Sequence, residues 1–322
     1  MSTPIVGLHH VTAIASDPQR NLDFYTQVLG LRFVKRTINF DNPGTYHFYF
    51  GDDVGAPGTI LTFFPWPNAS KGRLGAGEVI ATAFSIPIGS SGFWTERLKT
   101  SGVSFVENEH FGSRVITLSD SDGMLLELVE HNEKQATHAP RYSDVEANHA
   151  IQGFYGVTLL ERSLPRTEKV LELMGLKKVA EENGVIRFAP EGDALGRFID
   201  VKLDAAAPVG RMGPGTVHHI AFRNVDDAAQ ADWQAILARH LSVTPVQDRT
   251  YFHSIYFREP GGVLFEMATD NPGFLIDEPV ESLGEALRIP EWYEPMRQSI
   301  EARLTPLELH KFSAPSLAGV PR

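Results

Sequence analysis

The sequence predicts an α+β fold in which four βαβββ modules pair into two cup-shaped half-barrels. Four segments of roughly 50–60 residues follow one plan: an apolar strand, a helix that ends near a glycine, and closing strands. The dipeptide His-His stands on the opening strand of the first and the fourth segments, and the closing strands of the second and the fourth contain the related sequences DGMLLE and GGVLFE. Because a βαβββ module presents one curved face of its sheet, two modules are needed to form a cup.

The helix of the first module has clear sequence signals at both ends. Asp17-Pro18 can start it, since proline is favoured at the first helical position, and Gly30 is a natural stop after the last turn. The other modules repeat the plan. The predicted opening strands are residues 7–16, 79–87, 153–161 and 215–224; the predicted helices are 18–29, 93–102, 167–175 and 228–241; and the predicted closing strands include 45–50, 59–64, 114–130, 184–190, 197–203 and 254–269.

The order of the modules divides the chain into two halves and a tail. We expect an N-terminal domain of two modules at residues 1–135 and a C-terminal domain of two modules at residues 150–272. The stretch 131–150 is polar and contains proline, which is typical of a connection. Residues 273–322 lie outside the repeats, and an amphipathic pattern near residues 291–304 predicts a helical tail.

Composition excludes several classes of function. The chain of 322 residues has no cysteine, which rules out disulfides, thiolate nucleophiles and Cys-ligated metals. A net charge of −11 without a cluster of Lys and Arg disfavours nucleic acid and anionic membrane surfaces as partners. No apolar run approaches the roughly 20 residues of a membrane helix, and no secretion signal is recognisable, so we expect a cytoplasmic protein.

The base of a paired-module cup is contacted by the opening and closing strands of both modules. Pairing module one with module four gathers His10, His219 and Glu266, with Thr62 at the fourth corner. Two imidazoles and one carboxylate with open coordination positions form the facial triad of non-haem Fe(II) oxygenases, and Mn(II) suits the same ligands. The corresponding residues of the other modules are Thr82 and Glu127 in module two, and Gly156 and approximately Asp200 in module three. We therefore expect modules two and three to form a cup without a metal.

Strand alternation predicts which neighbours of His10 and His219 face the site and which face away from it. Thr12 lies two residues after His10, on the same face, and should line the site. His9 and His218 should point to the opposite face unless the strands are twisted or bulged, and we interpret His9 as structural. Glu127 is interpreted as structural because its module offers no histidine. The remaining histidines lack support from the repeats and are also interpreted as structural: His47, His110, His131, His138, His149, His240 and His310.

Several segments carry a resemblance to a known family. LHHVT, RFVKRT, YHFYF, GAPGTILTFFP and YFHSIYFREPGGVLFE resemble the vicinal-oxygen-chelate superfamily, and within it the ring-cleaving dioxygenases of the hydroquinone type. The resemblance implies an Fe(II) enzyme that inserts both atoms of dioxygen into an aromatic diol, with the same three ligands. It also implies that Tyr256 and His218 lie beside the metal as candidates for proton transfer. Arg249 and His253 are candidates for holding a substrate oxygen, and Phe and Trp side chains would form the pocket.

Other functions stay open at this point. A catechol extradiol dioxygenase would use the same ligands. A glyoxalase-like isomerase usually has a further carboxylate ligand where this chain has Thr62. A resistance protein that binds a small molecule would lack a full triad, and a purely structural metal site would lack open positions. The sequence leaves a homo-oligomer open.

Overall fold

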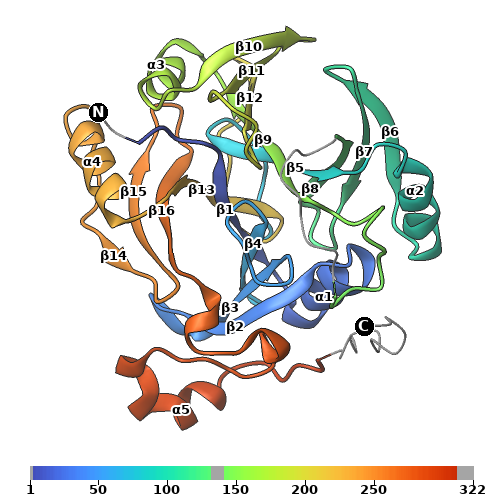
Figure 1. Cartoon of the computed structure of the whole chain (residues 1–322), viewed down its shortest axis with the longest axis vertical. Coiled ribbons are helices and arrows are strands. Elements are labelled where there is room, and N and C mark those ends of the chain that lie inside the picture. The colour runs from blue at the N-terminus through green and yellow to red at the C-terminus, as the bar shows by residue number, and fades with distance from the viewer. Residues whose placement is uncertain (1–2, 132–140, 310–322) are drawn as a thin grey trace, which may run out of the picture.

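The protein consists of two eight-stranded sheets, each curled into a half-barrel, with a few helices on their outer faces (Figure 1). The structure is a computed structural model, and it describes residues 3–131 and 141–309. The first sheet contains β1 (Leu8–Ala15), β2 (Arg32–Asn39), β3 (Asn42–Gly51), β4 (Ile60–Pro65), β13 (Thr216–Asn224), β14 (Gln247–Asp248), β15 (Phe252–Arg258) and β16 (Leu264–Pro272). The second contains β5 (Glu78–Ile86), β6 (Phe105–His110), β7 (Ser113–Ser119), β8 (Leu125–Glu130), β9 (Gly153–Glu161), β10 (Lys177–Glu182), β11 (Val185–Ala189) and β12 (Phe198–Leu203).

The order of strands confirms the predicted pairing of modules. The first sheet runs β14-β15-β16-β13-β1-β4-β3-β2, which joins module one to module four. The second runs β10-β11-β12-β9-β5-β8-β7-β6, which joins module two to module three. Each sheet thus takes one module from each half of the chain. The division into domains at residues 1–135 and 150–272 stays a prediction.

Each module has one helix, on the outside of its sheet. The helices are α1 (Pro18–Asp23), which continues as the π-helix η1 (Phe24–Val28), α2 (Ser91–Thr100), α3 (Pro165–Leu173) and α4 (Asp227–Leu237). The predicted ends of the first are confirmed: the Asp17 side chain accepts a hydrogen bond from the backbone of Arg20, and Gly30 has a φ of 68°. Apolar side chains of the outer sheet faces and the helices form one large core.

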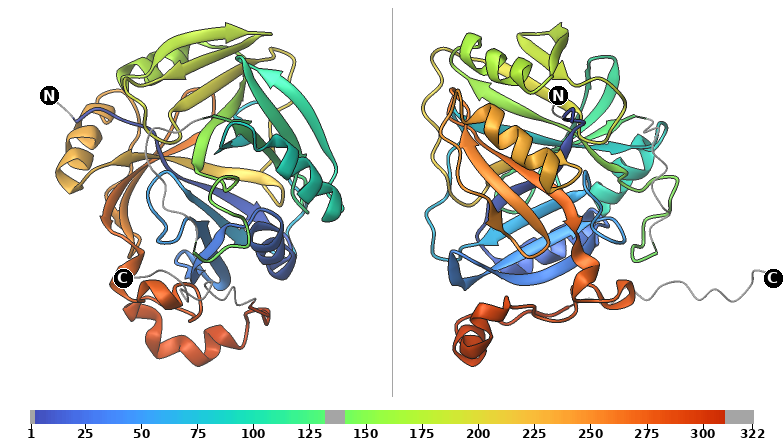
Figure 2. Two further views of the ribbon diagram at one scale, coloured as in Figure 1. Left: turned by 45° about the vertical axis from the view of Figure 1, so that its right-hand side comes forward. Right: turned by 60° about the vertical axis from the view of Figure 1, so that its left-hand side comes forward.

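The C-terminal segment packs beside the β2–β3 hairpin (Figure 2). It contains η2 (Phe274–Ile276), η3 (Val280–Ser282), η4 (Glu291–Met296) and α5 (Arg297–Glu301), so the predicted helical stretch is partly 3-10 helix. The buried ammonium group of Lys35 pairs with Asp277 and Glu278, and Tyr293 donates a hydrogen bond to the Phe40 carbonyl. These contacts support a hairpin that lines the site described below. Residues 132–140 of the predicted connection, residues 310–322 of the predicted tail, and therefore His138 and His310, lie outside the described residues.

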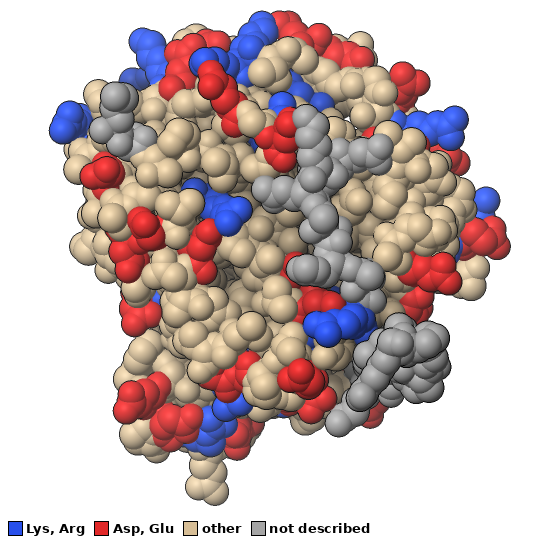
Figure 3. Space-filling view, in the orientation of Figure 1, with Lys and Arg blue, Asp and Glu red and all other residues tan. Residues whose placement is uncertain are grey.

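The described surface is of mixed charge. Figure 3 shows basic and acidic side chains interspersed over one face of the molecule, consistent with the net charge of −11. No helix among residues 3–131 and 141–309 is long and apolar enough to cross a membrane.

Candidate metal centre

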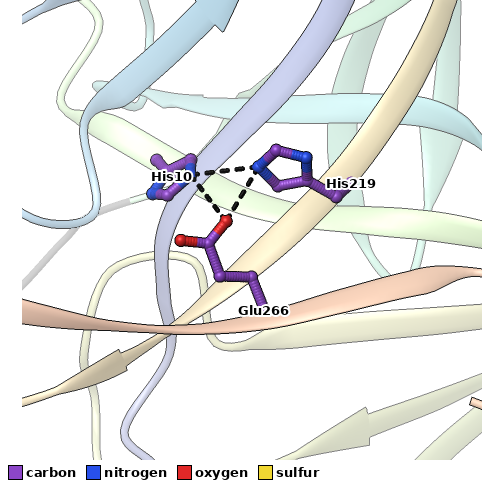
Figure 4. Close-up of side chains that lie close together, drawn as sticks. All are labelled: His10, His219 and Glu266. Carbon is purple, nitrogen blue, oxygen red and sulfur yellow. Dashed lines mark hydrogen bonds and ion pairs between the residues drawn. The ribbon is translucent and has the colours of Figure 1, made fainter. Parts of the chain in front are cut away.

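Three side chains from three neighbouring strands converge at the base of the first half-barrel. His10 comes from β1, His219 from β13 and Glu266 from β16 (Figure 4). The parallel pairing of β13 with β16 aligns Glu266 with Ala221, which lies opposite His10 in the antiparallel pairing of β1 with β13. The register therefore brings together residues that are 209 positions apart in the chain.

The three ligand atoms are arranged as a metal would require. Nε2 of His10 lies 3.3 Å from Nε2 of His219 and 3.3 Å from Oε2 of Glu266, and Nε2 of His219 lies 2.8 Å from the same oxygen. Three atoms at right angles around a metal, each at roughly 2.1 Å, lie about 3 Å apart. Glu266 Oε2 is buried and receives no well-aligned hydrogen bond, so these atoms point toward a common centre. The donor set thus fits a divalent cation.

A β-bulge explains how each His-His pair can occupy the base of the cup. In the pairing of β1 with β13, Leu8 lies opposite Phe222 and His10 opposite Ala221, so His9 is an extra residue. At the other bulge Thr12 lies opposite His219 and Ala13 opposite Val217, which makes His218 the extra residue. Bulges redirect a side chain that strict alternation would send to the other face.

The extra histidines hold the outer nitrogens of the ligand histidines. His9 Nδ1 lies 2.9 Å from His10 Nδ1, and His218 Nδ1 lies 2.7 Å from His219 Nδ1. Burial and then His10 lower the pKa of His9 well below its ordinary value, and burial and then His219 lower the pKa of His218 to about 3. A neutral neighbour accepts a hydrogen bond from Nδ1–H of the ligand ring, which leaves the lone pair of Nε2 free to bind a metal.

Glu266 is held as a carboxylate. Burial alone would raise its pKa, but His10 and His219 outweigh that effect and hold the pKa well below its ordinary value. The Ser254 hydroxyl donates a hydrogen bond of 2.5 Å to Oε1, which orients the carboxylate and leaves Oε2 toward the two imidazoles. A fully buried carboxylate is costly without a cation, so the site is prepared for a positive charge.

A cavity of about 480 Å³ opens above the three ligands. Its apolar wall consists of Phe40, Phe64, Trp66, Phe252 and Leu264. Its polar groups include His10, Thr12, His47, Tyr49, His218, His219, Arg249 and Tyr256. A cavity of this size with mainly apolar walls and a few polar groups is typical of a site for a small organic molecule.

Tyr256 and Arg249 form one polar side of the cavity. Tyr256 lies beside Glu266 in the pairing of β15 with β16, and its hydroxyl accepts a hydrogen bond of 3.2 Å from Nε of Arg249. Burial and then Glu266 raise the pKa of Tyr256, so the phenol keeps its proton at neutral pH. Arg249 Nη1 also reaches Asp41 at 3.3 Å. Both residues line the cavity that contains His10 and His219.

Thr12 and Thr62 end a hydrogen-bonded chain on the opposite side. The Thr62 hydroxyl donates to Thr12 at 2.8 Å, His47 Nε2 lies 2.9 Å from the Thr62 hydroxyl, and the Tyr49 hydroxyl lies 2.9 Å from His47 Nδ1. His47 was expected to be structural, yet it lines the cavity. His47 lies two residues before Tyr49, on the same face of β3, and Tyr49 pairs with Thr62. This spacing is the signal that could have identified His47 as a cavity residue.

His253 is the candidate residue that the structure places elsewhere. Ser254 and Tyr256 face the ligands, so His253 lies on the other face of β15, where its Nδ1 contacts Asp227 at the start of α4 at 2.6 Å. His253 does not line the cavity. The expectation that it holds a substrate oxygen is corrected accordingly, because strand alternation sends its side chain outward.

The second half-barrel contains no comparable cluster among the described residues. When the strand pairings of the two sheets are compared, three positions of the second sheet are equivalent to positions of the first, as predicted. Gly156 is equivalent to His219, Glu127 to Thr62 and Asp200 to Glu266. One match needs correction: Ala81 rather than Thr82 occupies the place of His10, because Ala81 lies opposite Thr158, the neighbour of Asp200.

Comparisons with known proteins agree with this geometry. Residues 7–128 match the model of the glyoxalase/bleomycin resistance protein/dioxygenase superfamily. The chain is 48% identical over 315 residues to MhqO of Bacillus subtilis (strain 168), which bears the provisional name ring-cleaving dioxygenase; the match covers 97% of this chain and 99% of the relative. It is 32% identical over 312 residues to a chlorohydroquinone/hydroquinone 1,2-dioxygenase of Sphingobium indicum, covering 92% and 95% of the two chains.

Solved structures show the same fold. A crystal structure from Bacillus subtilis, described provisionally as a dioxygenase, has a TM-score of 0.92 at 47% identity and covers 96% of this chain and 100% of that chain. Glyoxalase I from Zea mays has a TM-score of 0.61 at 13% identity, covering 82% of this chain and 92% of that chain. The second likeness concerns the fold alone.

Proposed function

Because this chain belongs to the glyoxalase/bleomycin resistance protein/dioxygenase superfamily, we propose that it is an Fe(II)-dependent ring-cleaving dioxygenase that acts on an aromatic diol, specifically a hydroquinone. The observation that carries the proposal is the convergence of His10, His219 and Glu266 below an aromatic-walled cavity. Three protein ligands leave coordination positions for a substrate oxygen and for dioxygen. When bound there, iron would supply the charge that favours a deprotonated diol and the electrons that activate dioxygen.

The residues around the metal would bind and orient the diol. Phe64, Trp66 and Phe252 provide apolar surface for an aromatic ring. Thr12 accepts from Thr62, so its own hydroxyl hydrogen is free to donate to a substrate oxygen. Arg249 places a permanent positive charge on the side of the cavity formed with Tyr256, where the charge favours an anionic substrate oxygen.

Tyr256 and His218 would move or hold protons. Tyr256 keeps its phenolic proton while Arg249 donates to its oxygen, so the phenol can donate a hydrogen bond to an oxygen atom that gains negative charge. His218 uses Nδ1 to accept from His219, which leaves its Nε2–H as a donor rather than a base. We therefore assign Tyr256 and His218 as donors that stabilise charge on the substrate side.

The position of Thr62 argues against a glyoxalase-like isomerase. The fourth corner of the cup is taken by a hydroxyl that is bonded to Thr12 and His47, with no carboxylate in its place. The choice of a hydroquinone over a catechol is supported by the relative whose name contains hydroquinone.

Oxygen uptake tests the proposal. The protein is freed of metal, loaded anaerobically with Fe(II) or with Mn(II), and mixed with hydroquinone or catechol before oxygen is admitted. We expect one dioxygen consumed for each hydroquinone by the Fe(II) form and much slower uptake with catechol. Absence of uptake with both diols while iron stays bound would overturn the dioxygenase assignment, and faster uptake with catechol would overturn the substrate.

A further inference from the structure

A second cavity, of about 550 Å³, lies between the two half-barrels and shares no lining residue with the metal cavity. Its walls are the start of β5, the end of β9 with the beginning of α3, a loop near residues 209–212, and the turn between β15 and β16. Thr167 of α3 donates a hydrogen bond of 2.7 Å to Glu259 in that turn, which fixes α3 against the β15–β16 hairpin. The cavity thus has walls from both sheets.

Glu161 is a buried acid with an unsatisfied oxygen in this cavity. Its side chain lines the cavity, the residue is 1% exposed, and Oε1 has no hydrogen-bond partner. Glu259 makes a hydrogen bond with the carboxyl of Glu161, but it also accepts from Thr167 and from the backbone of Gly261 and Val263, and Oε1 of Glu161 stays without a partner. An unpaired buried carboxyl costs free energy that a donor or a cation would recover.

Glu78 presents a second unsatisfied oxygen to the same cavity. Its Oε2 is buried and has no hydrogen-bond partner. Within the ranges 3–131 and 141–309, no Lys or Arg nitrogen forms an ion pair with Glu78 or Glu161. Three arginines line the cavity: Arg162 donates to the Ala207 carbonyl, Arg258 donates to the Gly262 carbonyl, and Arg166 is the third.

Glycines allow both carboxyls to lie directly on the backbone. A Cβ at Gly261 would stand 1.8 Å from Oε2 of Glu161, and a Cβ at Gly210 would stand 2.2 Å from Cγ of Glu78. A larger residue at either position would force the glutamate side chain to shift. The backbone is therefore shaped around these two side chains.

The pKa values of both acids are raised by their surroundings. Burial and then Glu259 raise the pKa of Glu161 to about 8. Burial raises the pKa of Glu78 to about 7, although Arg258 acts in the opposite direction. A bound cation would act in the opposite direction and favour the carboxylates.

We propose that this cavity binds a small organic cation through an ammonium or guanidinium group that donates hydrogen bonds to Glu161 and Glu78. A bare divalent metal is a poorer fit, because the described residues gather three ligand atoms within 4.8 Å only at His10, His219 and Glu266. An ammonium or guanidinium group carries several donors on a larger body, and so can reach acids that lie on different walls.

Calorimetric titration of the iron-loaded full-length protein with agmatine tests the proposal. At pH 7 we expect saturable binding with release of protons, detected as a binding enthalpy that changes with the ionisation enthalpy of the buffer. Glu161→Gln should weaken binding by at least about 10-fold, since a charge-assisted hydrogen bond contributes 1.5–3 kcal/mol. Glu191→Gln, a change at an exposed glutamate remote from the cavity, is the matched control and should leave binding unchanged.

Three outcomes would overturn the proposal. They are no binding of agmatine at millimolar concentration, equal affinity of the wild type and Glu161→Gln, and binding of inorganic phosphate in place of agmatine, which would assign the cavity to its arginines. If Glu161→Gln fails to fold, as judged by its thermal transition, Glu78→Gln provides the same test from the other wall. Because the titration does not depend on oxygen uptake, its result is independent of the proposed dioxygenase activity.

Discussion

The two half-barrels have the same topology but satisfy their central carboxylate in different ways. In the first, Glu266 faces His10 and His219 across a site suited to a metal. In the second, the equivalent Asp200 receives two hydrogen bonds from Arg187, at 2.8 and 2.7 Å. Arg187 lies beside Asp200 in the strand register, where the first half-barrel has Tyr256 beside Glu266.

The guanidinium group fills the space that the first half-barrel leaves for a ligand. Arg187 also donates to the Tyr155 hydroxyl at 2.7 Å and stacks over the rings of Phe111 and Phe198. The cavity that remains is about 10 Å³, against about 480 Å³ above the metal ligands. The residue beside the central carboxylate, Tyr256 in one half-barrel and Arg187 in the other, therefore decides whether the cup keeps an open cavity.

Among the changes that test the difference between the two half-barrels, replacing Glu266 should have the largest effect, and the effect is on metal affinity. Glu266→Gln removes the anionic ligand, and we expect at least a 100-fold loss of Fe(II) affinity, beyond the roughly 10–100-fold typical of losing a residue that only orients a ligand. Iron content after gel filtration and oxygen uptake with hydroquinone measure it. Asp200→Asn, the matched change in the second half-barrel, should retain one iron. Stoichiometric iron in Glu266→Gln would refute the ligand assignment.

Replacing Arg187 should be the most destabilising change in the second half-barrel. Arg187→Met leaves the buried Asp200 without its partner, which costs about 3–5 kcal/mol in the free energy of unfolding. Urea unfolding of the metal-free protein measures it. The double variant with Asp200→Asn removes both charges and should recover most of the loss. Equal stability of the wild type and the single variant would show that the ion pair is not required.

Removing the hydroxyl that orients Glu266 should have an intermediate effect. Ser254→Ala deletes the donor to Oε1, and we expect Fe(II) affinity to fall by about 10-fold with little change in unfolding. Competition with a metal chelator measures the affinity. Ser104→Ala, at an exposed serine, is the control. An unchanged affinity would mean that the two histidines alone orient the carboxylate.

The smallest expected effect is that of Glu127 on how the free energy of unfolding depends on pH. Burial and then Asp200 raise the pKa of Glu127, although Arg187 opposes them. The folded protein then binds this proton more tightly than the unfolded chain, so stability falls as pH rises from about 4.5 through the raised pKa. Glu127→Gln should remove this slope and stabilise the protein at pH 8 by on the order of 1 kcal/mol. Parallel stability curves for the two proteins from pH 5 to pH 8 would contradict the prediction.

The pairing of modules and the convergence of His10, His219 and Glu266 could be predicted from the sequence because both depend on local patterns. Strand alternation and the repeat place His10, His219 and Glu266 at equivalent points, and only one pairing of modules unites them. The bulges at His9 and His218 could not be predicted, since an extra residue in a strand depends on the pairing partner.

Long-range contacts account for the remaining differences. His47 was missed because its role arises from contacts with Thr62 and Tyr49 on two strands. His253 was placed wrongly because proximity in sequence to Tyr256 says nothing of the face it occupies. Arg187 gave no local signal, since its partner Asp200 belongs to another strand.

Because module one pairs with module four and module two with module three, the two half-barrels can be completed at different times during synthesis. The second sheet is formed by one continuous stretch, from Glu78 to Leu203, whereas the first joins the beginning of the chain to β16, which ends at Pro272. During translation the second half-barrel can fold while module one waits for a partner that has not yet been synthesised. The candidate metal site can therefore be completed only after nearly the whole chain has left the ribosome, and a prematurely terminated product would contain the arginine-filled cup without the cup that holds His10, His219 and Glu266.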